Sequence, residues 1–164
     1  MKNNKIKMLV MDVDGTITDG KIYMGEHGEI MKAFNIKDGY AIREILPNNN
    51  ILPVLITGRM SKIAENRALE LGIIHFYQGI ADKKSLLKNI VENENILMSN
   101  VAFIGDDIND LECMMNCGLI GCPADAAPEV KKIADFICKK KGGEGAVREF
   151  IEAIIKVKYR FKKT

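Results

Sequence analysis

Short apolar runs recur along the chain, separated by segments in which apolar residues follow helical spacing. An apolar run of roughly four to eight residues is typical of a strand buried on both faces, whereas an i, i+3, i+4 spacing is typical of an amphipathic helix. The runs predict strands at 6–11, 52–56, 74–77, 101–104, 118–121 and 135–138. The helical patterns predict helices near 39–46, 61–71, 83–93, 108–116, 127–132 and 145–157. This alternation indicates an α/β fold, a three-layer Rossmann-like parallel sheet with helices on both faces.

One segment breaks the alternation of strands and helices. Residues 21–34, KIYMGEHGEIMKAF, contain two short alternating stretches joined by Glu-His-Gly. They predict a β-hairpin, inserted at about 20–34 directly after the first strand. Elsewhere, Ser61 is a plausible N-cap of the helix at 61–71, and Gly72 would close that helix. No linker or repeat divides the sequence, so we expect a single domain over residues 1–164.

Composition and charge exclude several classes of protein. Of the 164 residues, 47% are hydrophobic and 28% are charged, as in soluble globular proteins. The net charge of +2 is too small to indicate a nucleic-acid partner, and the basic residues at 139–141 and 156–163 are expected to form a solvated face. No stretch approaches the length of a transmembrane helix. Asp12 and Asp14 interrupt the N-terminal apolar run too early for a signal peptide, which favours a cytoplasmic protein.

The four cysteines form no CxxC pair. Cys113 and Cys117 lie one helical turn apart, a spacing that could suit a metal, but both histidines are distant in sequence. We therefore expect buried free thiols in a reducing cytoplasm.

Candidate chemistry gathers where the predicted strands end. In an open α/β sheet, ligands bind in the crevice at the carboxyl ends of the strands. Acids, a hydroxyl group, a lysine and a glycine-rich turn converge on that edge. In chain order they are Asp12, Asp14, Gly15 and Thr16, then Thr57, Gly58 and Arg59, then Lys83, and finally Gly105, Asp106, Asp107 and Asp110.

These residue types match the needs of phosphoryl transfer, in which groups are positioned and negative charge is neutralised. Clustered carboxylates can hold Mg²⁺, which prefers oxygen ligands and would relieve their mutual repulsion. One carboxylate can attack phosphorus, while another protonates the leaving alkoxide and later deprotonates water. Thr57 and Lys83 would bind the phosphate oxygens that are not transferred. Each segment alone also fits an ordinary role, such as an acidic loop, a turn or a helix cap. Their order at successive strand ends favours the functional interpretation.

The same residues resemble the four motifs of the haloacid dehalogenase-like phosphatase superfamily. DVDGT resembles the first motif, ITG the second, Lys83 the third and GDDIND the fourth. The resemblance implies that Asp12 is the nucleophile and Asp14 the general acid/base. It implies that Mg²⁺ binds Asp12, the backbone carbonyl of Asp14, and Asp106. Asp107 would assist in the same shell or orient Lys83, with Asp110, Gly58 and Gly105 as supporting residues.

A finer resemblance is to the capless family of 3-deoxy-D-manno-octulosonate 8-phosphate (KDO 8-phosphate) phosphatases. It extends through FNIKDGYAI, TGRMSKIAENRALELGI, YQGIADK and GGEGAVREF. It implies a homotetramer assembled by the hairpins, whose glycine-rich segment approaches a neighbouring active site. Glycine flexibility at 142, 143 and 145 fits a mobile tail from about residue 139. Lys32, Arg59 and Arg148 are then candidates to bind the carboxylate or phosphate of the substrate, a sugar-acid phosphate.

Departures from that family leave other functions open. Thr16 stands where valine is more common, and Gly-Glu-Gly stands where Gly-Arg-Gly is more common. Phosphatases of nine-carbon sialic-acid-type 9-phosphates have a similar tail, but tend to carry Glu where this chain has Arg59. The same domain also occurs fused to acylneuraminate cytidylyltransferases. A hypothesis from another class is a phospho-accepting receiver, in which the acidic pair and the acceptor follow different strands. The roles of Asp19, Glu144 and the basic C-terminal tail stay undecided.

Overall fold

The first strand, β1 (Met8–Met11), is completely buried because helices cover both faces of the sheet to which it belongs. This is seen in a computed structural model that describes residues 6–160, with side chains to residue 156. The other strands of the sheet are β4 (Leu52–Ile56), β5 (His75–Tyr77), β6 (Val101–Ile104), β7 (Leu119–Cys122) and β8 (Phe136–Ile137). All neighbours pair in parallel, in the order β5-β4-β1-β6-β7-β8. The predicted parallel sheet is therefore confirmed.

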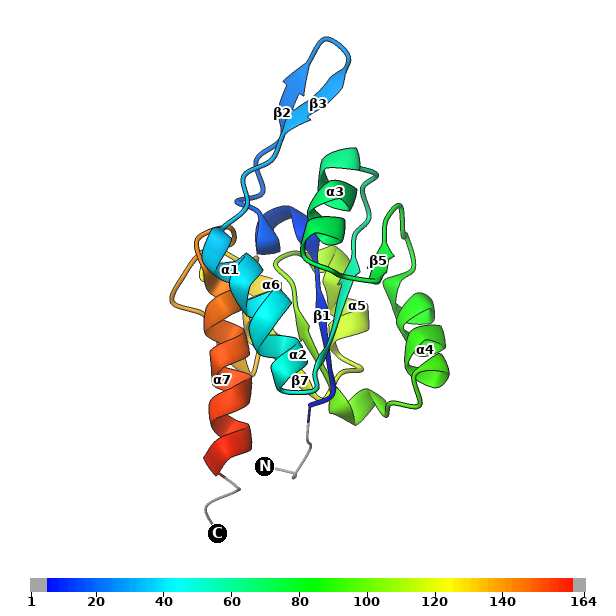
Figure 1. The fold of residues 1–164 in the computed structure, drawn as a ribbon, viewed down its shortest axis with the longest axis vertical. Helices are drawn as coiled ribbons and strands as arrows, with labels where there is room; N and C mark the ends of the chain where they lie inside the picture. The colour runs from blue at the N-terminus through cyan, green and yellow to red at the C-terminus, as the bar shows by residue number, and fades with distance from the viewer. Residues whose placement is uncertain (1–5, 161–164) are drawn as a thin grey trace.

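Two helical layers cover the sheet (Figure 1). The side chains of Leu9 and Met11 pack toward α2 (Leu46–Asn48), α3 (Lys62–Glu70) and α7 (Ala146–Arg160). Those of Met8 and Val10 pack toward the other layer. That layer consists of α4 (Lys83–Asn93), α5 (Leu111–Met114) and α6 (Pro128–Ile133). Alternation along one strand thus supplies two separate apolar cores.

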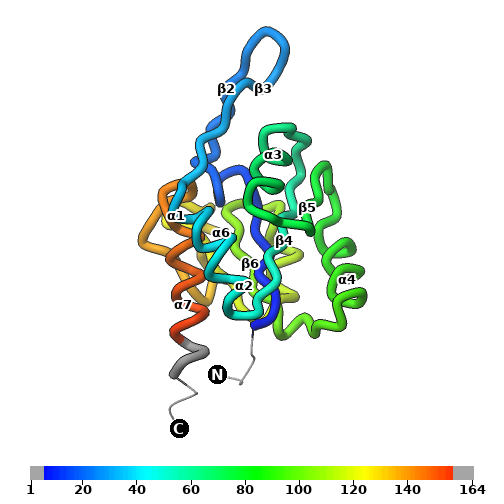
Figure 2. The backbone as a smooth tube through the Cα atoms, in the orientation of Figure 1, coloured from blue at the N-terminus to red at the C-terminus, as the bar shows by residue number. Residues whose placement is uncertain are grey.

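The predicted hairpin is present and projects from the body of the molecule (Figures 1 and 2). It consists of β2 (Tyr23–Gly25) and β3 (Gly28–Met31), and its base is closed by a bridge between Thr18 and Phe34. Gly25 pairs with Gly28. The turn is therefore Glu26-His27, and the glycine of the expected Glu-His-Gly connection lies in the second strand.

Several strand and helix boundaries agree with those predicted from the sequence. The strands at 52–56 and 101–104 and the helix at 83–93 have the predicted bounds. Ser61 caps α3 by accepting a hydrogen bond from Ala64 N at 3.2 Å, and Gly72 follows its end with a φ of 69°.

No helix among residues 6–160 combines the length and apolarity needed to cross a membrane. Beyond 156, the side chains of the basic tail lie outside the described residues.

Two predicted helices differ in the structure. The helix expected at 39–46 begins at Ile36, because the Asn35 side chain accepts from the backbone N–H groups of Lys37 and Asp38. It continues through α1 (Ile36–Tyr40), the turn η2 (Ala41–Ile45) and α2. The helix expected at 108–116 is instead a turn, η4 (Ile108–Asp110), followed by the single turn of α5. The remaining short elements are η1 (Val13–Ile17) and η3 (Met98–Asn100).

Candidate active site

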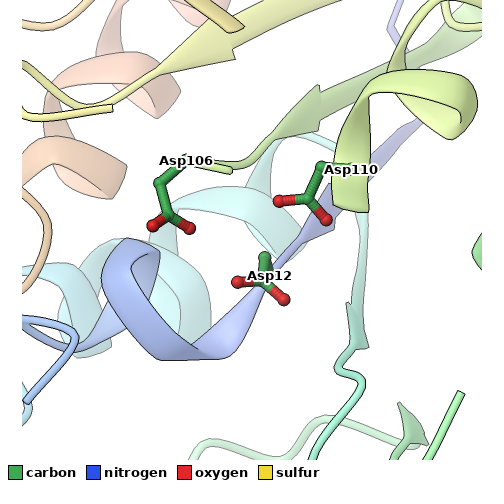
Figure 3. A group of neighbouring side chains, drawn as sticks. All are labelled: Asp12, Asp106 and Asp110. Carbon is green, nitrogen blue, oxygen red and sulfur yellow. The ribbon is translucent and has the colours of Figure 1, made fainter. Parts of the chain in front are cut away.

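Three carboxylates meet at the carboxyl edge of the central strands (Figure 3). Asp12 follows β1, Asp106 follows β6, and Asp110 ends the turn η4. Each contributes an oxygen atom, and the three oxygens lie within 4.8 Å of one another. The convergence has a simple cause, because β1 and β6 pair directly and Asp12 N donates to Ile104 O at 3.1 Å.

Lys83 supplies the positive charge of this cluster. Its ammonium group lies 2.6 Å from Asp12 Oδ1 and 2.7 Å from Asp110 Oδ1, and all three side chains are buried. Lys83 is the first residue of α4, whose N-cap is Asp82. Buried charges are tolerated when they are paired and hydrogen-bonded in this way. The predicted proximity of Lys83 to the acidic residues is therefore confirmed.

One cation does not balance three acids. Burial raises the pKa of Asp12 to about 8, and the charge of Asp110 adds to the rise while Lys83 opposes it. Burial also raises the pKa of Asp106 to about 6, although Thr16 Oγ1 donates to Asp106 Oδ1 at 3.0 Å and lowers it. Proton affinity raised by burial and crowding is relieved when a further cation binds.

The residues present fit a divalent cation with oxygen ligands. Asp110 Oδ2 is buried and has no hydrogen-bond partner among the described residues. The donors are carboxylate oxygens, the ligand type that Mg²⁺ prefers. Two glycines allow the close approach: a Cβ atom at Gly15 would overlap the Asp106 carboxylate, and one at Gly105 would lie 2.5 Å from Asp110 Oδ2.

The carboxylate of Asp14 points to a different set of partners. It forms an ion pair with Lys32 Nζ, and Arg59 Nε lies 3.9 Å from its Oδ2. Its side chain is therefore directed to two of the predicted substrate-binding cations. The expected contribution of Asp14 to the metal site, through its backbone carbonyl, stays a prediction.

The fourth motif places its acids Asp107 and Asp110 in different surroundings. Asp107, considered as the residue that orients Lys83, is exposed, and its Oδ1 accepts from Ile108 N at 2.8 Å. It caps the turn η4, which carries Asp110 inward to Lys83. Asp110 contacts Lys83, and a role of Asp107 in the metal shell or in orienting Lys83 stays a prediction.

The second motif places a hydroxyl group and a cation at the neighbouring strand end. Thr57 is buried after β4, and its Oγ1 accepts from Arg59 N at 3.4 Å. Gly58 separates the two residues. β4 pairs with β1 on the side opposite β6, so Thr57 and Asp106 flank Asp12. This is the arrangement that the strand-end argument predicts.

Arg148 contacts residues outside the acidic cluster. On α7 its Nε atom lies 2.6 Å from Glu152 Oε1, and its guanidinium carbon lies 5.6 Å from the centre of the Tyr40 ring. Arg148 N donates to Asp38 Oδ1 at 2.7 Å. Its assignment to substrate binding stays a prediction.

The glycine-rich segment 139–145 packs against residues 15–19 of its own chain. Gly143 N donates to Thr16 O at 3.2 Å, and Gly142 N donates to Asp125 Oδ1 at 3.0 Å. A Cβ atom at Gly142 would overlap Gly15 O, and one at Gly143 would lie 2.5 Å from Asp19 N. The expected mobility of this segment stays a prediction, but its contacts brace residues 15–19.

The two undecided acids, Asp19 and Glu144, lie in local turns. Asp19 Oδ1 accepts from Lys21 N at 3.0 Å, so Asp19 forms a turn at the base of the hairpin. Glu144 is exposed, and its N–H donates to Lys141 O at 3.1 Å.

The sequence interpretation missed Glu29. This hairpin residue contacts Lys32, Arg59 and Ser61, and its side chain is only 12% exposed. Burial opposes its ionisation, but those partners lower the pKa of Glu29. The alternation of the hairpin is a weak signal, because it does not show which face meets the body.

Comparison with known proteins agrees with the chemistry that the geometry of the site indicates. Residues 61–151 match the family model described as haloacid dehalogenase-like hydrolase. The chain is 44% identical to the 3-deoxy-D-manno-octulosonate 8-phosphate phosphatase of Salmonella typhi over 94% of its own length and 81% of that protein. Among solved structures it matches the corresponding phosphatase of Moraxella catarrhalis in complex with magnesium, phosphate and KDO. That match has a TM-score of 0.89 and 38% identity, and covers 93% of this chain and 87% of the other.

The cobalt-bound phosphatase of Haemophilus influenzae gives a TM-score of 0.90 at 33% identity, covering 95% of this chain and 91% of that one. Two of these structural neighbours therefore hold divalent cations. The matched family is one of hydrolases, which favours the phosphatase hypothesis over the receiver.

Proposed function

Because this chain belongs to the haloacid dehalogenase-like hydrolases, within the 3-deoxy-D-manno-octulosonate 8-phosphate phosphatase branch, we propose that it is a Mg²⁺-dependent phosphatase of KDO 8-phosphate. The observation that carries the proposal is the buried contact of Lys83 with Asp12 and Asp110, beside Asp106 and Thr57. In this proposal, the nucleophile, the phosphate-binding cation and the metal ligands share one edge of the sheet. The similarity to phosphatases with this substrate in their names supports the choice of substrate.

In the proposed reaction, Asp12 attacks phosphorus and forms an aspartyl-phosphate while the bond from phosphorus to the sugar oxygen breaks. Asp14 donates a proton to the departing alkoxide. Asp14 then takes a proton from water, whose oxygen attacks phosphorus and breaks the bond to Asp12. Phosphate leaves, and both carboxylates return to their initial states. Thr57 donates a hydrogen bond to a phosphate oxygen, and Lys83 supplies charge to the same group.

Asp12, Asp106 and the backbone carbonyl of Asp14 would hold Mg²⁺, with Asp110 in the same cluster. When bound, the ion neutralises negative charge on the phosphoryl group and the carboxylates. Lys32 and Arg59 both lie beside the carboxylate of Asp14. We assign them, with Arg148, to the carboxylate and phosphate groups of the sugar acid.

We propose that the hairpins assemble the chain into a homotetramer in which neighbouring subunits complete the sites. Exposed apolar side chains support this: Met24 is 63% exposed and Ile30 is 65% exposed, and both lie on the projecting hairpin (Figure 1). A two-stranded hairpin is marginal alone, and an exposed apolar surface is typical of an interface. Light scattering after size-exclusion chromatography tests this, and a monomeric protein contradicts it.

We further propose that residues 1–164 act as one domain in the cytoplasm. One sheet with two continuous helical layers supports the single domain. Four free thiols, with Cys113, Cys122 and Cys138 buried, fit a reducing compartment.

A comparison of rates on three substrate classes tests the function. We expect the highest kcat/KM with Mg²⁺ on KDO 8-phosphate, lower values on nine-carbon sialic-acid-type 9-phosphates, and the lowest on hexose phosphates. A preference for the 9-phosphates would reassign the substrate within the sugar acids. A preference for hexose phosphates would contradict the branch but not the chemistry.

A further inference from the structure

A charged side chain of the hairpin lies beside the candidate acid/base. Glu29, in β3, has Lys32 Nζ 2.7 Å from its Oε1, and Arg59 Nη2 lies 3.7 Å from the same oxygen. Lys32 and Arg59 are also the two cations that approach the carboxylate of Asp14. Glu29 thus shares both cationic partners of Asp14.

The second carboxylate oxygen of Glu29 ties the hairpin to the body of the protein. Ser61 Oγ donates to Glu29 Oε2 at 2.5 Å. Ser61 is also the N-cap of α3, so its hydroxyl group has a fixed position at the start of that helix. Oε2 of Glu29 is therefore held by the residue that caps α3, and Oε1 lies beside two cations.

The burial of Lys32 restricts where its ammonium group can lie. The side chain of Lys32 is fully buried, although lysine is normally exposed. Burying an ammonium group is unfavourable unless its charges are paired, and Lys32 is paired with both Glu29 and Asp14. Asp14 alone leaves one side of Lys32 without an anionic partner, so Glu29 fixes where the ammonium group lies.

We propose that Glu29 is a positioning residue for the phosphatase reaction, holding Lys32 and Arg59 against the carboxylate of Asp14. This inference rests on the proposed function, in which Asp14 moves a proton to the sugar oxygen. It also gives the hairpin a second role besides assembly, because the position of β3 then sets the orientation of the acid/base. Glu29 acts through its neighbours and does not itself touch the reacting atoms.

The test compares Glu29→Gln with Glu26→Gln, which removes the same charge from the exposed turn of the same hairpin. We expect kcat of Glu29→Gln on KDO 8-phosphate to fall about tenfold with KM changed less than about threefold, since misplacement of a catalytic group affects the chemical step. Glu26→Gln should keep both constants. Thermal melting and light scattering should show that both variants retain the fold and the assembly of the wild type.

A double-mutant cycle separates positioning from general structural support. If Glu29 acts largely through Lys32, adding Glu29→Gln to Lys32→Met should lower kcat by less than about twofold beyond Lys32→Met alone. Fully additive losses, an unchanged kcat in Glu29→Gln, or a loss explained by altered assembly would each overturn the inference. In each of those three outcomes, the wild-type protein itself would still turn over KDO 8-phosphate with Mg²⁺. Absence of any wild-type turnover with Mg²⁺ would instead overturn the proposed function, and this inference with it.

Discussion

Lys83 and Asp12 are 71 positions apart in the sequence, yet Lys83 Nζ lies 2.6 Å from Asp12 Oδ1 in the buried edge of the sheet. A second carboxylate, that of Asp110, lies 2.7 Å from the same nitrogen. One ammonium group therefore stabilises two buried acids. The stability of the metal-free protein and the proposed chemistry both depend on it.

Replacing Lys83 by methionine should be strongly destabilising. The change leaves two buried carboxylates without their cation, which costs about 3–5 kcal/mol when one partner of a buried pair is removed. We expect this loss in urea unfolding with EDTA present, together with loss of phosphatase activity. Lys84→Met is the matched control, because Lys84 pairs with Glu112 on the surface and loss of an exposed pair should cost far less stability. Equal losses in the two variants would contradict a special role for the buried pair.

Replacing Asp12 by asparagine should abolish turnover and preserve the fold. The amide is not a nucleophile toward phosphorus, so we expect kcat to fall at least about a thousandfold. Stability without metal should be maintained or increased, since the substitution removes a buried acid whose ionisation burial disfavours. Phosphate release and thermal melting in EDTA measure the two effects. Wild-type activity in this variant would rule out Asp12 as the nucleophile.

The stability of the metal-free protein should fall between pH 6 and pH 8. The pKa of Asp12 is raised from 3.8 to about 8 by burial. In this pH range the unfolded chain has lost the proton that the folded protein still holds, so rising pH favours unfolding by at most about 1.4 kcal/mol per unit for this group. The Asp12→Asn variant should lack that part of the slope. Urea unfolding at several pH values in EDTA makes the comparison.

Magnesium should stabilise the protein more at pH 8 than at pH 6. A cation and a proton compete for the same carboxylates, so Mg²⁺ binds better as Asp12 and Asp106 lose their protons. Only the folded protein assembles the ligand cluster, and binding therefore raises Tm. Calorimetric scans with and without Mg²⁺ at both pH values test this. An equal or larger shift at pH 6 would contradict it.

Gly143→Ala should impair both stability and activity. Gly143 has a φ of 72°, and an added Cβ atom would lie 2.5 Å from Asp19 N, in the segment that follows the candidate catalytic residues. We expect a loss above the roughly 1–2 kcal/mol of left-handed strain alone. Gly28→Ala is the control, because its φ is also positive, at 114°, but among the described residues beyond its two chain neighbours no atom lies within 4 Å of the added methyl group. Matching melting curves for the two variants would show that the contact with that segment is unimportant.

The residues at the strand ends could be identified from the sequence because parallel strands place their carboxyl ends at one edge. Asp12, Thr57 and Asp106 follow short apolar runs, so local pattern and topology together bring them near one another. Lys83 begins a helix with a clear aspartate cap, and its placement followed from the same rule.

Other contacts depend on side-chain direction, which spacing does not specify. Asp107 and Asp110 are both in the fourth motif, but only the turn η4 decides which of them faces inward. Glu29 meets Ser61 because tertiary packing brings β3 to the start of α3, a relationship without a local signature. Arg148 has an acid four residues later on its own helix, and Glu152 pairs with it there.

The contact between Gly143 N and Thr16 O also has a consequence for synthesis of the chain. The ribosome makes Asp12 and Asp14 first, whereas the residues that brace their loop come near the C-terminal end of the sequence. A nascent chain therefore carries both carboxylates long before it can hold them in place. Hydrolytic activity should appear only once the glycine-rich segment has left the exit tunnel and packed beside residues 15–19.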